Sequence, residues 1–297
     1  MRLLLLGGTG QVGTELRGFA LPDDVEVVAP KRSVLDLQDA SAIANVIAAE
    51  PWSAVINCAA YTEVDRAESD EPTAFAVNAE APARLAAETA KFGIPLLTVS
   101  TDYVFDGRKG RPYREEDPVA PLNAYGRTKL AGEKRVREAN PRHVILRTSW
   151  LFSPYGRNFV KTILRLAAER DRLTIVADQR GCPTAAHEVA RACLDIAIQC
   201  VVKPEHAPYG VYHFAGGGEA TWFDFAREIV HLAGDRLVRL PQMLPIRTGD
   251  YPTAAVRPAD TRLDCSAVGT QFGVAPSHWQ RGLEAVMDRL LPRKGLA

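Results

Sequence analysis

A glycine-rich turn near the start of the chain constrains its fold more than any other feature. Residues 3–6 are four consecutive leucines, an apolar run typical of a buried parallel strand. The run leads directly into the sequence GGTGQVG, in which Gly7, Gly10 and Gly13 are three residues apart, and then into a helix-compatible stretch. Without side chains the backbone can approach a pyrophosphate, whose charge the helix N-terminus stabilises. The segment therefore predicts a dinucleotide-binding strand–turn–helix unit.

The rest of the first half alternates between strand and helix patterns. Strand patterns occupy residues 25–29, 54–57, 95–100 and 143–148, and helix patterns occupy 39–50, 73–92 and 123–138. Alternation of this kind predicts a parallel sheet with helices on both faces. We therefore expect an α/β fold in which residues 1–150 form a Rossmann-type, doubly wound parallel sheet that binds a dinucleotide.

The second half has less regular patterns. Helix patterns remain at residues 159–169, 187–199 and 222–233. Thr221 precedes the last of these as a predicted N-cap. We expect residues 151–297 to form mainly a smaller C-terminal substrate-binding lobe, with some segments (about 174–215) returning to the Rossmann sheet.

Charge and composition argue against several classes of partner. Lys plus Arg and Asp plus Glu both number 36, and no basic stretch is dense enough to indicate nucleic acid or an anionic membrane. The five cysteines are odd in number and scattered, and neither they nor the six histidines show metal-ligand spacing. Because the chain starts with a strand pattern and has no membrane-spanning run, we expect a cytoplasmic protein.

A tyrosine and a lysine in the predicted helix 123–138 provide the first sign of chemistry. Tyr125 and Lys129 are four residues apart, so both project from one face of the helix. A fixed cation beside a phenol favours the phenolate, which would give the proton donor that carbonyl reduction requires. The same spacing also fits an ordinary solvated helix face, so the pair alone does not distinguish a catalytic site from a surface helix.

Polar residues follow the predicted strands, where ligands bind in open parallel sheets. The third strand ends in the small-residue sequence NCAAYT, and the fourth ends in Thr101, Asp102 and Tyr103. A hydroxyl, a carboxylate and a phenol at one strand end favour a binding site over a plain turn. The fifth strand pattern ends in Arg147, Thr148, Ser149 and Trp150. Arg147 suits an anionic substrate or a surface ion pair, and Trp150 suits a ligand wall or the core.

These segments resemble a known family. GGTGQVG, NCAAYT, STDYVFDG and AYGRTKLAGE occur in this order in extended short-chain dehydrogenase/reductases. Within them the chain is similar to the dTDP-4-dehydrorhamnose reductases, which use a nicotinamide cofactor to reduce the 4-keto group of dTDP-4-dehydro-L-rhamnose. The segments RTSW, NF, DQ, PT and RP in the second half also look like that family, so the resemblance covers nearly the whole chain.

The resemblance implies roles for individual residues. Thr101 would hydrogen-bond the substrate carbonyl, Tyr125 would protonate the C4 oxygen as hydride arrives, and Lys129 would bind the nicotinamide ribose and lower the Tyr125 pKa. With the glycine turn included, the predicted cofactor contacts are Gly7, Gly10, Gln11, Val12, Gly13, Arg32, Asp36, Leu37, Ala59, Ala60, Tyr61, Tyr125 and Lys129. The predicted substrate contacts are Thr101, Asp102, Tyr103, Tyr125, Trp150, Asn158 and Arg257.

The second strand pattern is followed by cations. NAD-specific sites normally place an acid there, on the ribose 2′-hydroxyl. Here the sequence reads Pro30-Lys31-Arg32, and the first acid is Asp36. Cations suit the 2′-phosphate, so we predict NADPH as the preferred cofactor, with NADH as the second choice.

Three positions bear on metal binding and on a homodimer. In some family members carboxylates hold Mg²⁺ at a dimer interface, and Glu15 and Glu188 match two of them. The third acidic position corresponds to Arg289, which would oppose a cation. We predict no metal site, and Glu15 and Glu188 also fit solvated helix faces. The sequence does not distinguish a homodimer from a monomer.

Two other functions are compatible with the fold. A nucleotide-sugar epimerase or dehydratase would keep NAD bound, but such enzymes usually need the acid after the second strand. Dehydratases also need an acid pair, and Tyr103 follows Asp102 here. A non-catalytic regulatory subunit would be expected to lack the Tyr or the Lys, and both are present. The sequence favours the reductase, although it does not distinguish thymine from uracil in the substrate.

Overall fold

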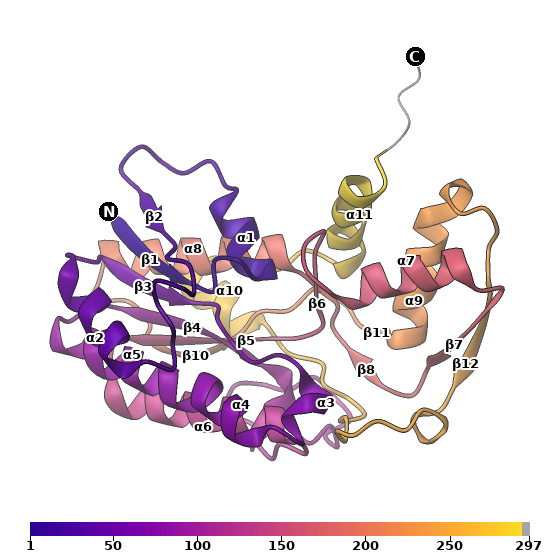
Figure 1. The fold of residues 1–297 in the computed structure, drawn as a ribbon, viewed down its shortest axis with the longest axis horizontal. Coiled ribbons are helices and arrows are strands. Elements are labelled where there is room, and N and C mark those ends of the chain that lie inside the picture. The colour runs from indigo at the N-terminus through magenta and orange to yellow at the C-terminus, as the bar shows by residue number, and fades with distance from the viewer. Residues whose placement is uncertain (293–297) are drawn as a thin grey trace.

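The centre of the protein is a six-stranded parallel sheet. A computed structural model describes residues 1–292, apart from the side chain of residue 235. The strand order is β10-β5-β4-β3-β1-β2, and every neighbouring pair is parallel (Figure 1). The strands are β1 (Arg2–Leu6), β2 (Glu26–Val28), β3 (Ala54–Asn57), β4 (Leu96–Thr101), β5 (His143–Thr148) and β10 (Gly210–His213). The predicted α/β fold with a doubly wound parallel sheet is confirmed.

Alternate leucines of β1 show why the sheet is covered on both sides. Leu3 and Leu5 pack in one apolar cluster, and Leu4 and Leu6 pack in another, as the two-residue period of a strand requires. The first cluster includes α1 (Gln11–Arg17), α8 (Ala186–Val202) and α10 (Ser266–Phe272). The second includes α2 (Ala40–Ala49), α5 (Ala81–Lys91) and α6 (Ala124–Ala139). Figure 1 shows these two helical layers on either side of the sheet.

The predicted helix 73–92 has an irregular centre. The structure has α4 (Glu71–Phe75), a π-helical turn (Ala76–Glu80) and then α5. A π turn holds an extra residue, and such turns are frequent at functional sites. Here the turn carries Asn78, which is almost fully buried. Sequence periodicity missed this departure because a single wide turn barely disturbs the apolar pattern.

A third apolar cluster forms a C-terminal lobe beside the sheet. It contains α7 (Phe159–Glu169), α9 (Trp222–Ala233) and α11 (Trp279–Leu290), around the buried Phe152, Phe225 and Leu283. Figure 1 shows this lobe at the right of the sheet. Thr221 caps α9 as predicted, in a capping box with Asp224.

Short strands complete the lobe and were not predicted. They pair as β7 (Arg172–Val176) with β12 (Gln242–Ile246), β8 (Arg180–Gly181) with β11 (Ala220–Thr221), and β6 (Leu151–Phe152) with β9 (Thr184–Ala185). Within residues 174–215, α8 and β10 lie on the central sheet, whereas β7 and β8 belong to these pairs. The division into domains at residue 150 stays a prediction.

Strand register brings the predicted site residues together. Leu6 is the partner of Asn57, and Thr101 is the partner of Thr148. The carboxyl ends of β1, β3, β4 and β5 therefore form one edge of the sheet. Within residues 1–292, no helix is both long and apolar enough to cross a lipid bilayer.

Candidate active site

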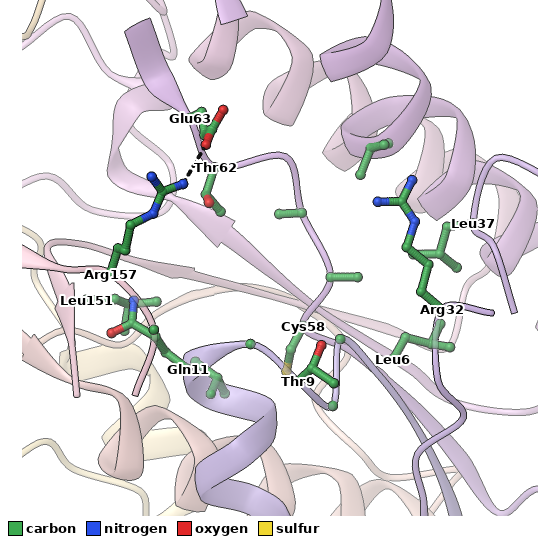
Figure 2. A pocket seen from close by; sticks show the side chains of 18 of the residues that line it. Leu6, Thr9, Gln11, Arg32, Leu37, Cys58, Thr62, Glu63, Leu151 and Arg157 are labelled. Carbon is green, nitrogen blue, oxygen red and sulfur yellow. Dashed lines mark hydrogen bonds and ion pairs between the residues drawn. The ribbon is translucent and has the colours of Figure 1, made fainter. Parts of the chain in front are cut away.

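A cavity of about 840 Å³ lies at the carboxyl ends of β1 and β3. Its lining includes most of the predicted cofactor contacts, namely Gly7, Gly10, Gln11, Val12, Arg32, Asp36, Leu37, Ala59 and Ala60. Figure 2 shows the cavity between Arg32 and Leu37 on one side and Arg157 and Leu151 on the other. The sequence analysis missed Arg157, because its segment is far from the glycine turn in sequence.

The glycine turn tolerates no side chains at two of its positions. Gly7 has a φ of +76°, and a Cβ there would lie 2.6 Å from the backbone nitrogen of Ala59. A Cβ on Gly13 would lie 2.2 Å from the carbonyl oxygen of Gly7. The segment after β3 and the first turn of α1 therefore pack closely on the glycine turn, and α1 begins directly after the turn at Gln11. These features fit the pyrophosphate of a dinucleotide.

Asn78 fixes the segment that follows β3. Its side-chain oxygen accepts a hydrogen bond from the backbone nitrogen of Tyr61 (2.9 Å), and its amide donates to the carbonyl of Tyr61 (3.1 Å). The same amide donates to the hydroxyl of Thr128 on α6 (3.2 Å). The π turn thus ties a predicted cofactor-binding segment to the helix that carries Tyr125. An Asn among the alanines of the predicted helix 73–92 was the only sequence signal for it.

Helix α6 packs closely on the segment after β4. Asn123 caps the helix by accepting a hydrogen bond from the backbone nitrogen of Gly126 (2.8 Å). A Cβ on Gly126 would lie 2.2 Å from the carbonyl oxygen of Tyr103, so only glycine permits this approach. The rings of Tyr103 and Tyr125 meet edge to face with centroids 6.0 Å apart. The structure therefore brings these predicted site residues together.

Tyr125 is half-buried, and its phenol carries a proton at neutral pH. Burial raises the pKa of Tyr125 to about 12, although a hydrogen bond with Thr101 acts in the opposite direction. The pKa of Tyr125 is therefore above its usual value, and the expected lowering by Lys129 stays a prediction. The loss of solvation on burial outweighs the stabilisation of the phenolate.

Lys129 is buried on the same helix. Its ammonium donates a hydrogen bond to the carbonyl of Val99 in β4 (2.7 Å). Burial lowers the pKa of Lys129 to about 8, and the negative charge of Glu133, one turn further on, opposes this shift. An ammonium has three donors, so two remain for a ligand.

Asp102 is a buried carboxyl group beside Thr101. One oxygen accepts a hydrogen bond from the Thr101 hydroxyl (3.0 Å), and the other has no partner among the described residues. Burial raises the pKa of Asp102 to about 7. A polar atom that is buried and unpaired costs free energy, and a bound ligand could satisfy it.

Arg257, in the C-terminal half of the chain, lies close to Tyr103 and Asp65. Its guanidinium donates two hydrogen bonds to Asp65 on α3 (Val64–Ala67), at 3.1 and 2.7 Å. Its positive charge also lies close enough to Tyr103 to oppose the rise in the pKa of that phenol. The predicted substrate contacts Thr101, Asp102, Tyr103, Tyr125 and Arg257 are therefore grouped at one edge of the sheet.

Trp150 has the only positive φ among the non-glycine residues of the described chain, at 45°. Its indole stacks on Trp222, with ring centroids 3.5 Å apart and planes inclined by 6°. A Cβ on Gly181 would lie 2.4 Å from the indole of Trp150. Strained backbone of this kind clusters at functional sites. Its predicted contact with the substrate stays a prediction.

Two predicted residues have other partners in the structure. The side-chain amide of Asn158 donates to Gln11 (3.0 Å) and to the carbonyl of Ser153 (2.7 Å), so Asn158 lies at the cofactor cavity. Arg147 is 3% exposed and is paired with Glu133, which leaves it unavailable to an anionic substrate. Sequence alone could not show that Glu133 on α6 would pair with Arg147.

The possible metal-binding positions are occupied by protein contacts. Arg289 donates two hydrogen bonds to Glu15, at 2.8 and 2.9 Å, and a third to the hydroxyl of Tyr155 at 2.8 Å. Glu188 accepts a hydrogen bond from the hydroxyl of Ser277. Within residues 1–292, no group of three or more His, Cys, Asp or Glu side chains could hold a metal ion.

The doubly wound sheet and the glycine turn at a large cavity are those of a dinucleotide-binding protein. With Thr101 at the end of β4 and with Tyr125 and Lys129 on α6, they define an extended short-chain dehydrogenase/reductase. The chain belongs to the RmlD substrate binding domain family, which it matches over residues 1–291. It is 42% identical over 291 residues to a dTDP-4-dehydrorhamnose reductase of Sinorhizobium fredii, covering 98% of both chains.

Solved structures agree with this assignment. A dTDP-4-dehydrorhamnose reductase from Clostridium acetobutylicum superimposes with a TM-score of 0.89 at 35% identity, covering 98% of this chain and 99% of the other. The enzyme of that name from Bacillus anthracis, in complex with NADP, gives a TM-score of 0.87 at 33% identity, covering 97% and 99%.

Proposed function

We propose that this protein reduces the 4-keto group of dTDP-4-dehydro-L-rhamnose to give dTDP-L-rhamnose, with NADPH as the cofactor. The relatives of this name support the substrate, and the complex of one of them with NADP supports the cofactor. The single observation that carries the proposal is the grouping of Thr101, Tyr125 and Lys129 at the edge of the sheet that also holds the cavity of the glycine turn.

Tyr125 acts as the general acid. Reduction of a ketone adds a hydride to carbon and a proton to oxygen, and bound NADPH supplies the hydride. With a pKa of about 12, Tyr125 carries its proton at neutral pH and can give it to the C4 oxygen as negative charge develops there. The group that an acid step needs is therefore present in the correct protonation state.

Thr101 and Lys129 assist this proton transfer. Thr101 acts to lower the pKa of Tyr125, which makes the phenol a better acid than burial alone would allow. The Lys129 ammonium, held by the Val99 carbonyl, has two further donors for the cofactor ribose. Its positive charge also favours the phenolate left after proton transfer.

The cavity residues would hold the dinucleotide along its length. The glycine turn and the N-terminus of α1 would bind the pyrophosphate. Arg32 lines the cavity with its side chain 78% exposed, and its nearest acid, Asp36, is 3.8 Å away. A guanidinium so weakly paired is available to the 2′-phosphate that distinguishes NADPH from NADH.

The proposal is tested by mixing the purified protein with dTDP-4-dehydro-L-rhamnose and NADPH and following the absorbance of the reduced cofactor. We expect the cofactor to be consumed in equal amount to the sugar. A parallel reaction with the UDP-linked sugar shows whether the protein prefers thymine or uracil in the nucleotide of its substrate. If neither sugar causes consumption while NADPH binds, the reductase proposal is wrong.

A further inference from the structure

A pair of opposite charges spans one end of the cofactor cavity. Arg157 donates a hydrogen bond from Nη2 to Oε1 of Glu63 at 2.9 Å, and both residues line the cavity. Glu63 belongs to the segment after β3, whereas Arg157 lies between β6 and α7. Figure 2 shows the pair at the side of the cavity opposite Arg32. The two arginines therefore flank the space for the dinucleotide from its two sides.

The backbone on both sides of Arg157 is anchored to the glycine turn. Asn158 donates a hydrogen bond to the side-chain oxygen of Gln11 (3.0 Å), and Ser153 donates to the same oxygen (2.9 Å). A Cβ on Gly156 would lie 3.6 Å from Cγ of Gln11. Gln11 is the first residue of α1, whose N-terminus is the expected site of the pyrophosphate. This anchoring holds a cation beside the position of the phosphates.

The pair with Glu63 is easily exchanged. The side chain of Arg157 is 93% exposed and that of Glu63 is 44% exposed. Ion pairs in water contribute about 0–1 kcal/mol. Glu63 also pairs with Arg66 at 3.3 Å, so its carboxylate keeps a partner when Arg157 leaves. A guanidinium gains more from a phosphate, which accepts two parallel hydrogen bonds.

We propose that Arg157 changes partner when the cofactor binds: it pairs with Glu63 in the free protein and with the pyrophosphate in the complex. Before the cofactor binds, the Glu63 carboxylate pairs with the Arg157 guanidinium and holds it beside the cavity. Arg157 is thus a cofactor-binding residue, and Glu63 competes with the cofactor for it. This inference rests on the proposed use of NADPH and adds a residue to its binding site.

The experiment measures the dissociation constant of NADPH by titration calorimetry on the full-length protein. We expect Arg157→Ala to weaken NADPH about tenfold, as the loss of a charge-assisted hydrogen bond would. Adenosine 2′-monophosphate contains no pyrophosphate, so its binding should be equal in Arg157→Ala and wild type. Glu63→Gln should bind NADPH about two- to threefold more tightly, because the competing charge is gone.

Two further variants test whether Glu63 affects NADPH binding through Arg157. Arg66 contacts the same Glu63 carboxylate but does not line the cavity, so Arg66→Ala should weaken NADPH binding by no more than about twofold, because Glu63 then has no second partner when Arg157 leaves. In the double variant with Arg157→Ala, Glu63→Gln should no longer tighten binding. Thermal unfolding checks that each variant is folded.

Each outcome decides a separate point. If the wild type binds no NADPH, the proposed function fails and this inference fails with it. If the wild type binds NADPH and Arg157→Ala binds it equally well, only this inference is overturned. Equal weakening of adenosine 2′-monophosphate would show that Arg157 does not act on the pyrophosphate. Weaker binding by Glu63→Gln would overturn the competition.

Discussion

Arg147 and Glu133 form an ion pair in the interior, with Nε–Oε1 at 2.9 Å and Nη2–Oε2 at 2.7 Å. Both side chains are at most 4% exposed, and Ser100 donates to the same carboxylate at 2.5 Å. Removing one partner leaves a buried charge without compensation. We therefore expect Glu133→Gln to lower the free energy of unfolding by about 3–5 kcal/mol, measured by urea denaturation.

An exposed pair provides the matched control. Arg165 and Glu169 are 2.7 Å apart on α7 with side chains 60% and 51% exposed. Glu169→Gln should change the free energy of unfolding by no more than about 0.5 kcal/mol. Equal losses in the two variants would mean that the pair of Arg147 and Glu133 contributes little.

Arg32 should determine the choice between the two cofactors. The guanidinium of Arg32 lines the cavity, and its ion pair with Asp36 is long, at 3.8 Å. We therefore expect Arg32→Ala to raise the dissociation constant of NADPH about tenfold. NADH has no 2′-phosphate, so its dissociation constant should change less than about twofold. Lys31→Ala is the control, since Lys31 does not line the cavity. A similar loss for NADH and NADPH would contradict the assignment.

Asp102 should make stability depend on pH in an unusual direction. Its pKa is about 7 in the folded protein and 3.8 as the ordinary value. Between these values the folded state keeps a proton that the unfolded state releases. The free energy of unfolding therefore falls, through this group, as pH rises from about 4 to about 7. Asp102→Asn should remove that decrease, so the variant gains stability relative to wild type as pH rises.

Asp39 is the control of opposite sign. It caps α2, and hydrogen bonds from Ser41 lower its pKa below the ordinary value. Its contribution is present above about pH 4 and is lost as pH falls, so Asp39→Asn should lose stability mainly at neutral pH. Urea denaturation at a series of pH values compares the two variants. The same pH trend in both would argue against the buried, protonated state of Asp102.

Arg289 should stabilise the protein through Glu15 without a metal ion. Glu15 is 6% exposed and accepts two hydrogen bonds from Arg289. We expect Arg289→Ala to lower the free energy of unfolding by about 1–3 kcal/mol, because a buried carboxylate loses its partners. Arg281→Ala, at an exposed position of the same helix, should have little effect. A wild-type Tm that falls on adding a chelator would contradict this account.

The sheet could be predicted because its signals are local. Four leucines, a glycine turn and alternating patterns each lie within a few residues of one another, and their period reports burial on both faces. The strands β6, β8, β9 and β11 could not be predicted because each has two residues. Pairing partners from elsewhere in the chain create such strands, and no local pattern records them.

The residues of the site could be predicted from the sequence, but their burial, charge partners and pKa values could not. Motifs identified Tyr125 and Thr101, and the direction of the Tyr125 pKa depends on how deeply the fold buries the phenol. Arg147 looked available to a ligand until α6 supplied Glu133. Asn158 contacts Gln11 across 147 positions of sequence, a contact that only the folded chain shows. Long-range packing decides each of these cases.

Transfer of deuterium from labelled NADPH tests the central claim most directly. The protein is mixed with NADPH that carries deuterium at its hydride position and with dTDP-4-dehydro-L-rhamnose, and the product is examined by NMR. Tyr125→Phe serves as the inactive variant. Tyr209→Phe serves as its control, since Tyr209 belongs to none of the sites and its hydroxyl has no partner among the described residues.

We predict a single deuterium at C4 of the sugar with wild type and with Tyr209→Phe. Tyr125→Phe should form this product at least about a hundredfold more slowly while remaining folded. Deuterium at another carbon, no deuterium in the sugar, or equal rates for Tyr125→Phe and wild type would contradict the assignment of Tyr125 as the acid of a C4 reduction.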